Sequence, residues 1–172
     1  MKFTWPKYIL LALAIILAQV LVLNHVAFQT YVNPYLYVFL ICMLPFNTNK
    51  TLTLAIAFVV GFMVDVFSDT AGWHAGASVL AMFTRNVMIN ITKPLEGHEE
   101  GDGISVFSLG LSNYLIFTGI IVGIHHFYLF FIESFKWSSL FPSLLKGLFS
   151  SVFTLILMIS FQYIFIQKKR RR

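Results

Sequence analysis

The feature that most constrains this chain is that apolar residues fill almost all of it. Hydrophobic residues make up 58% of its 172 residues and charged residues only 11%, which is typical of polytopic membrane proteins. A tilted membrane-spanning helix needs about 20 residues, so the chain can form at most about six of them with short connections. No room is left for a soluble catalytic domain.

Six apolar segments are candidates for these helices: Tyr8 to Leu23, Tyr35 to Leu44, Leu52 to Phe67, Trp73 to Ile91, Phe107 to Phe131 and Leu144 to Ile166. The first follows Lys2 and Lys7 as a signal peptide would, but its apolar stretch is longer than is usual for one. The second is short and closed by Pro45, so it either crosses or is re-entrant. We therefore predict an all-α fold, a single transmembrane domain over residues 1–172 with six, alternatively five, spanning helices.

The basic residues indicate the orientation of the chain. The tail Lys168 to Arg172 equals the whole formal net charge of +5 and directly follows an apolar segment, which favours a membrane anchor contacting lipid and not a nucleic-acid site. With six crossings, Lys136 lies on one side, and the tail shares the other with Lys2, Lys7, Lys50 and Lys93. The positive-inside rule then predicts that both termini are cytoplasmic, whereas five crossings would place Lys2 and Lys7 outside.

Polar residues inside the apolar segments are candidates for functional positions. Arg85 lies twelve residues into the fourth segment, where a cation costs roughly 2.5 to 3.5 kcal/mol on insertion scales. His74 precedes it by eleven positions and so falls on the same helical face. Arg85 either reaches the headgroups, forms a buried ion pair or contacts a substrate. Asp65 precedes a short connection to His74, and we expect these two side chains to meet.

Motifs for catalysis or metal binding are weak. His125 and His126 are adjacent, so on a helix they point about 100° apart and do not suit one metal ion. The acidic stretch from Glu96 to Asp102 lacks the ligand spacing of an EF-hand and reads as a solvated loop. The single Cys42 cannot form an internal disulfide. We predict no catalytic site, no metal site and no cofactor.

Four short motifs together resemble a known family of bacterial membrane proteins. They are Leu44-Pro45, the stretch from Gly61 to Ser68, the stretch from Ala71 to Ala75, and Thr84-Arg85. In this pattern the chain resembles the rod shape-determining protein MreD family. The resemblance is specific from about Tyr35 to Pro94 and looser elsewhere, where it rests on length, helix count and the basic C-terminus.

The resemblance implies a non-enzymatic scaffold in the bacterial inner membrane. MreD proteins belong to the elongation machinery that builds lateral peptidoglycan. They work with the bitopic protein MreC alongside MreB, the glycan polymerase RodA and its transpeptidase. On this interpretation eight residues are structural or partner-binding candidates: Pro45, Gly61, Asp65, Gly72, His74, Gly76, Arg85 and Gly119.

Two other interpretations remain open from the sequence. The family is similar in architecture to the six-helix substrate-binding subunits of energy-coupling-factor transporters. A carrier of that type would have an outward-facing cavity lined by polar groups such as Asp65, His74 and Asn113. An intramembrane enzyme would instead need Asp65, His74 and Arg85 to converge on one point.

Overall fold

The computed structural model describes residues 4–25, 32–91 and 103–165, and the regular elements of these residues are helices. The all-α prediction is confirmed. In chain order the elements are α1 (Trp5–Leu21), η1 (Leu23–His25), α2 (Val38–Cys42), α3 (Lys50–Ser68), α4 (Trp73–Ile91), α5 (Val106–Leu109), α6 (Leu111–Ser134), η2 (Trp137–Ser139) and α7 (Leu140–Phe165).

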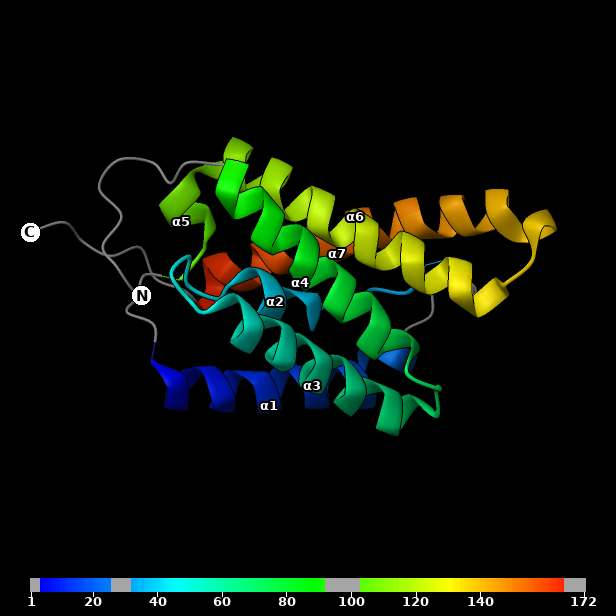
Figure 1. The fold of residues 1–172 in the computed structure, drawn as a ribbon, viewed down its shortest axis with the longest axis horizontal. Helices are drawn as coiled ribbons and strands as arrows, with labels where there is room; N and C mark the ends of the chain where they lie inside the picture. Colours follow the sequence, from blue (N-terminus) through cyan, green and yellow to red (C-terminus); the bar gives the residue numbers. More distant parts are fainter. Residues whose placement is uncertain (1–3, 26–31, 92–102, 166–172) are drawn as a thin grey trace, which may run out of the picture.

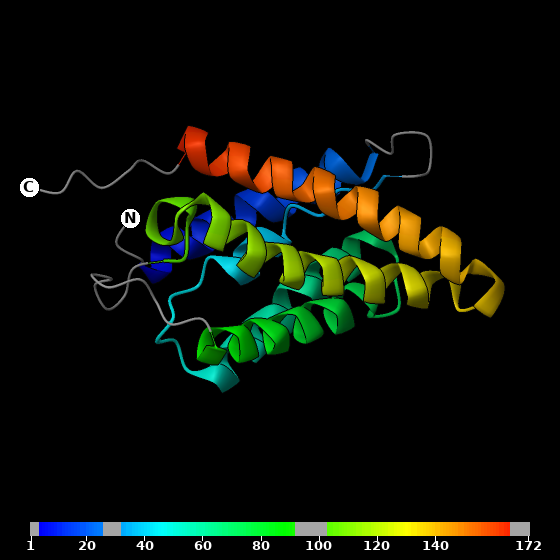
Figure 2. The same ribbon diagram turned by 90° about the horizontal axis from the view of Figure 1, so that it is seen from above.

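The long helices lie lengthwise beside one another in an elongated bundle (Figures 1 and 2). We call the end at which α1 begins and α7 ends the proximal end (Figure 1). The α3–α4 and α6–α7 connections lie at the opposite, distal end. The helices pack in the order α3, α4, α6, α7, and α1 also packs against α3. Within the described residues, the first long helix thus begins and the last long helix ends at the same end of the bundle.

The length and composition of the helices indicate that this chain is a membrane protein. Four helical stretches are long and apolar enough to cross a bilayer, namely Trp5–His25, Lys50–Ser68, Leu111–Ser134 and Leu140–Phe165. α4 has the same length as α3. Its buried polar residues make it less apolar than the other long helices. It carries His74 and Arg85, which were predicted to share one helical face, and both are buried against protein.

The segment Tyr35 to Leu44, the second of the six candidate spans, is helical only over Val38–Cys42. Pro34 and Pro45 flank it, and proline interrupts helical hydrogen bonding. The segment is nevertheless buried, with Val38 to Leu40 inaccessible to solvent. Figure 1 shows α2 in the interior, between the ends of the bundle. The segment is therefore half helical and is enclosed by the long helices.

Side chains from α1 and α7 form hydrogen bonds with the backbone of this enclosed segment and of the two residues before it. Ser150 and Thr154 of α7 accept hydrogen bonds from the backbone N–H groups of Asn33 and Tyr35, each at 3.0 Å. On the α1 side, Gln19 Nε2 donates to the Pro34 carbonyl at 3.0 Å, and the Tyr8 hydroxyl donates to the Leu40 carbonyl at 3.2 Å. Non-helical backbone at membrane depth is tolerated only when it is satisfied in this way.

One of the expectations about charge differs in the structure, and two others are not tested by it. Lys146 lies on α7 near the distal end and contacts Glu133 at 3.2 Å. Lys136 therefore shares its side of the bundle with a second cation, whereas the sequence predicted Lys136 alone there. The acidic stretch Glu96 to Asp102 and the tail Lys168 to Arg172 lie outside the described residues.

Candidate functional site

The carboxyl group of Asp65, on the last turns of α3, holds the start of α4. Its Oδ1 accepts hydrogen bonds from the Thr70 hydroxyl at 2.5 Å and from the His74 backbone N–H at 3.0 Å, and His74 Nδ1 lies 3.1 Å away. Its Oδ2 accepts from the Ala75 N–H at 2.8 Å. The first N–H groups of a helix have no partner within the helix. Asp65 therefore caps the neighbouring helix, and the expected contact with His74 is present.

The glycines of the motif serve this same junction. Gly72 has φ +84°, a left-handed conformation that glycine adopts without strain, directly before α4. Gly61 lies where α3 and α4 approach most closely. A Cβ atom at Gly61 would lie 2.5 Å from the His74 carbonyl oxygen and 2.6 Å from Ala75 Cα. Gly61 is therefore occupied by internal packing of this hairpin, whereas a Cβ at Gly72 would meet nothing within 4 Å and the glycine there suits the backbone conformation.

Arg85 binds the end of the enclosed segment. Its Nη2 donates to the carbonyl oxygens of Leu44 and of Pro45, the latter at 3.2 Å, and its Nη1 lies 3.4 Å from Asn86 Oδ1. The side chain is only 1% exposed, so it does not extend to the headgroups. Within the described residues no acid pairs with it. Of the three roles that the sequence left open for Arg85, the structure thus shows neither a headgroup contact nor an ion pair with a described acid. Arg85 instead binds backbone carbonyls, including that of Pro45.

The remaining two candidate glycines differ from Gly61 in their surroundings. A Cβ at Gly76 would lie 3.0 Å from the Tyr128 hydroxyl of α6, a flexible side chain. A Cβ at Gly119 would meet only Leu155 Cδ1 at 4.0 Å, and one at Gly123 would meet nothing within 4 Å. Gly119 and Gly123 are thus the two α6 glycines that leave open space beside their helix.

A buried cluster of rings surrounds Tyr35, and sequence reasoning did not find it. Tyr35 lies 5.3 Å from the ring centres of both His74 and His126, and 5.9 Å from that of His125. His125 Nε2 is 2.6 Å from the Tyr37 hydroxyl. His126 Nε2 is 3.0 Å from Thr154 Oγ1. The adjacent pair on α6 was the signal in the sequence, because two histidines in an apolar span need polar partners.

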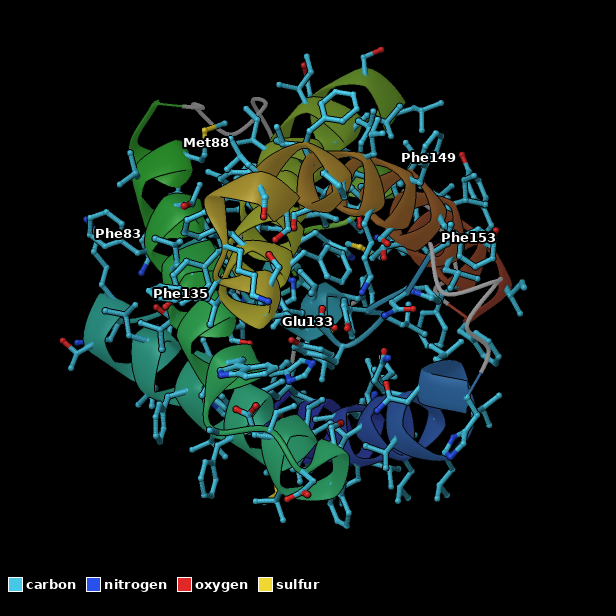
Figure 3. The ribbon with its side chains drawn as sticks, turned by 90° about the vertical axis from the view of Figure 1, so that its right-hand side faces the viewer. Phe83, Met88, Glu133, Phe135, Phe149 and Phe153 are labelled. Carbon is cyan, nitrogen blue, oxygen red and sulfur yellow. The ribbon has the colours of Figure 1, made fainter. Side chains whose placement is uncertain are left out.

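A cavity of about 340 Å³ opens at the distal end. Its walls come from the end of α1, the enclosed segment, the α3–α4 connection and the end of α6. Among the residues that line it are Asn24, Tyr35, Thr70, Trp73, His74 and Glu133. Figure 3, which views the protein from this end, places Glu133 near the middle of the bundle, whereas Phe83 and Phe149 lie on its perimeter. The cavity thus opens inside the ring of helices.

The structure brings together only some of the residues that the carrier and enzyme interpretations require. His74 lines the cavity, but Asn113 is exposed near the start of α6, at the proximal end, and bonds the Leu109 carbonyl. Arg85 follows His74 by eleven positions, about 16 Å along a helix, and contacts Leu44 and Pro45 instead. Asp65 and His74 meet, while Asn113 and Arg85 each lie away from them. Within the described residues no group of acids, histidines and cysteine could hold a metal ion.

Comparisons of the chain with protein-family models, with curated proteins and with solved structures found no match.

Proposed function

We propose that this protein is a non-enzymatic membrane scaffold of the MreD type, located in the bacterial inner membrane with both termini in the cytoplasm. In this role it binds an MreC-like bitopic protein and helps to organise lateral peptidoglycan synthesis with MreB, RodA and its transpeptidase. The enclosed segment counts as the second of six crossings, although only half of it is helical.

One observation carries this proposal: the polar residues of the MreD-like motif hold parts of the bundle together. Asp65 and His74 join α3 to α4. Arg85 joins α4 to the carbonyls of Leu44 and Pro45. Residues that are bonded in this way within the bundle suit a rigid framework better than a reaction with turnover, because chemistry needs groups that are free to meet a substrate.

The partner surface we propose is the open face of α6 beside Gly119 and Gly123. Membrane helices associate through close packing at small residues, because lipid is as apolar as the side chains. Gly61 and Gly76 already face α4 and Tyr128 respectively, whereas Gly119 and Gly123 leave room for an incoming helix. Ile116 and Ile120 are exposed on the same part of α6 and offer apolar contact area.

Co-purification from native membranes tests the proposal. The tagged protein should retain an MreC-like partner in mild detergent, and Gly119→Leu and Gly123→Leu should reduce the retained amount. Gly76→Leu is the matched control, because it places the same side chain against Tyr128 inside the bundle. A wild-type protein that retains no such partner would contradict the scaffold, and unchanged retention by both α6 variants would exclude this surface.

The distal cavity favours a second candidate, a small-molecule-binding subunit of the energy-coupling-factor type. Its volume lies within the range of roughly 300 to 1,000 Å³ that is usual for ligand pockets. A carrier predicts that a small molecule remains bound after purification. Native mass spectrometry of the purified protein separates the two candidates, because a scaffold retains a protein partner and a carrier retains a ligand.

A further inference from the structure

The distal cavity presents hydrogen-bond acceptors from two helices to whatever enters it. Glu133 lines it from the end of α6, and His74 lines it from the start of α4. The aromatic residues Tyr35, Phe67 and Trp73 also line it. The protonation states of these groups therefore decide which ligands the cavity can bind.

The hydrogen bonds of His74 decide which of its nitrogens carries the proton. The Thr70 hydroxyl has one hydrogen, and its 2.5 Å contact directs that hydrogen to Asp65 Oδ1. Thr70 Oγ1 and Asp65 Oδ1 therefore both present lone pairs to His74 Nδ1, each at 3.1 Å. Nδ1 must be the donor, and in a neutral imidazole the other nitrogen is then an acceptor. His74 is 95% buried, and no described residue bonds its Nε2.

Glu133 adds a carboxylate to this acceptor. Lys146 Nζ lies 3.4 Å from its Oε1 and 3.2 Å from its Oε2, but Lys146 does not line the cavity. A carboxylate has about four lone-pair sites, so one ammonium contact leaves further sites for a ligand. His25 and Tyr35 are the other titratable residues of the wall.

We propose that this cavity binds a small protonated amine, with its ammonium group between Glu133 and His74 Nε2 and its carbon atoms against the aromatic wall. Ammonium groups are donors without acceptor capacity, which complements two acceptors. Aromatic faces also attract cations within about 6 Å of the ring centre. The scaffold role does not require such a site, so the inference is independent of it, whereas it deepens the second candidate, the small-molecule-binding subunit, which uses the same cavity.

The test is thermal unfolding of the full chain in phosphatidylglycerol nanodiscs, titrated with n-butylammonium and with n-butanol as a neutral analogue. A ligand that binds only the folded state raises the Tm as its concentration rises. We expect a saturable rise with n-butylammonium and none with n-butanol. Glu133→Gln should weaken the apparent affinity by roughly tenfold or more, as expected when a hydrogen bond to a charged group is lost.

Lys146→Gln is the matched control, because it removes the same ion pair but keeps the carboxylate. It should bind n-butylammonium at least as tightly as the wild type. Equal effects of n-butylammonium and n-butanol, no effect of n-butylammonium on the wild type, or equal losses in both variants would overturn the proposal.

The ammonium group can come from a free solute or from a lipid headgroup, and a second arm distinguishes these sources. Nanodiscs that contain phosphatidylethanolamine should raise the Tm of the wild type and compete with n-butylammonium if the headgroup enters the cavity. Native mass spectrometry should then find this lipid on the wild type and less of it on Glu133→Gln. If n-butylammonium binds equally in both nanodiscs, the ligand is a soluble amine.

Discussion

Nη2 of Arg85 donates a hydrogen bond to the carbonyl oxygen of Pro45 at 3.2 Å, which joins α4 to a residue 40 positions earlier in the chain. The same nitrogen also bonds the Leu44 carbonyl. These carbonyls lie just beyond α2, where Pro45 cannot continue a helix. The buried guanidinium of Arg85 thus donates to the Leu44 carbonyl and adds a second donor to the Pro45 carbonyl, which also accepts a hydrogen bond from the Thr48 N–H at 3.4 Å.

Arg85→Leu should loosen the enclosed segment, because the Leu44 carbonyl loses the Arg85 donor and the Pro45 carbonyl keeps only a 3.4 Å hydrogen bond from the Thr48 N–H. Each buried polar group left without a partner costs about 1 to 3 kcal/mol. Cys42 is the single cysteine and has 0% exposure, so it reports on opening of this segment. We expect maleimide to label Cys42 roughly tenfold faster or more in the variant. Exposed Lys136→Leu is the control, and equal labelling in the two variants would show that Arg85 does not hold the segment.

Asp65→Asn should destabilise the α3–α4 junction, because an amide group has one oxygen where the carboxylate presents two to surrounding donors. The side-chain NH₂ group would face an N–H or hydroxyl donor, at a cost of about 1 to 3 kcal/mol. Asp69→Asn is the matched control. Asp69 is exposed with φ 53°, a conformation that asparagine also tolerates. Tryptophan fluorescence during thermal unfolding should show a lower Tm for Asp65→Asn only; similar values for both variants would contradict the capping role.

Gly61→Ala should be harmful and Gly123→Ala should not, although each adds one methyl group to a long helix. The new methyl group at Gly61 would meet backbone atoms of α4 at 2.5 and 2.6 Å, and overpacking of this kind costs typically about 1 to 3 kcal/mol. At Gly123 nothing lies within 4 Å. Denaturation in sodium dodecyl sulfate should rank the variants in this order. A tolerated Gly61→Ala would mean that α3 and α4 can separate without loss of the fold.

Cysteine labelling should place Thr4 and Asn47 on one side of the membrane and Asp69 and Lys136 on the other. All four residues are exposed and lie near helix ends. In a Cys42→Ser background, a membrane-impermeant maleimide should label intact cells at positions 69 and 136 only. Labelling at positions 4 and 47 should require permeabilisation. Finding Thr4 and Asn47 on opposite sides would show that the enclosed segment does not cross.

The sequence by itself determined which parts of the chain form long helices. The segment Trp73 to Ile91 coincides with α4, and Leu52 to Phe67 lies within α3. The predicted segment Phe107 to Phe131 is divided at Gly110, which has φ +76° and separates α5 from α6. The Asp65 contact with His74 was also predictable, because a short connection keeps residues nine positions apart close in space. Hydropathy and short-range contacts depend on local sequence, so they can be read without knowing the fold.

Only the tertiary structure decided how the remaining polar groups are satisfied. The partners of Arg85 lie on the enclosed segment, and those of His125 and His126 come from that segment and from α7. The structure alone also separates Gly61, which faces α4, from Gly123, where a Cβ would meet nothing within 4 Å. A polar group buried in an apolar segment needs a hydrogen-bond partner, but the sequence does not identify that partner, because many distant groups could form the bond. Long-range packing selects one of them.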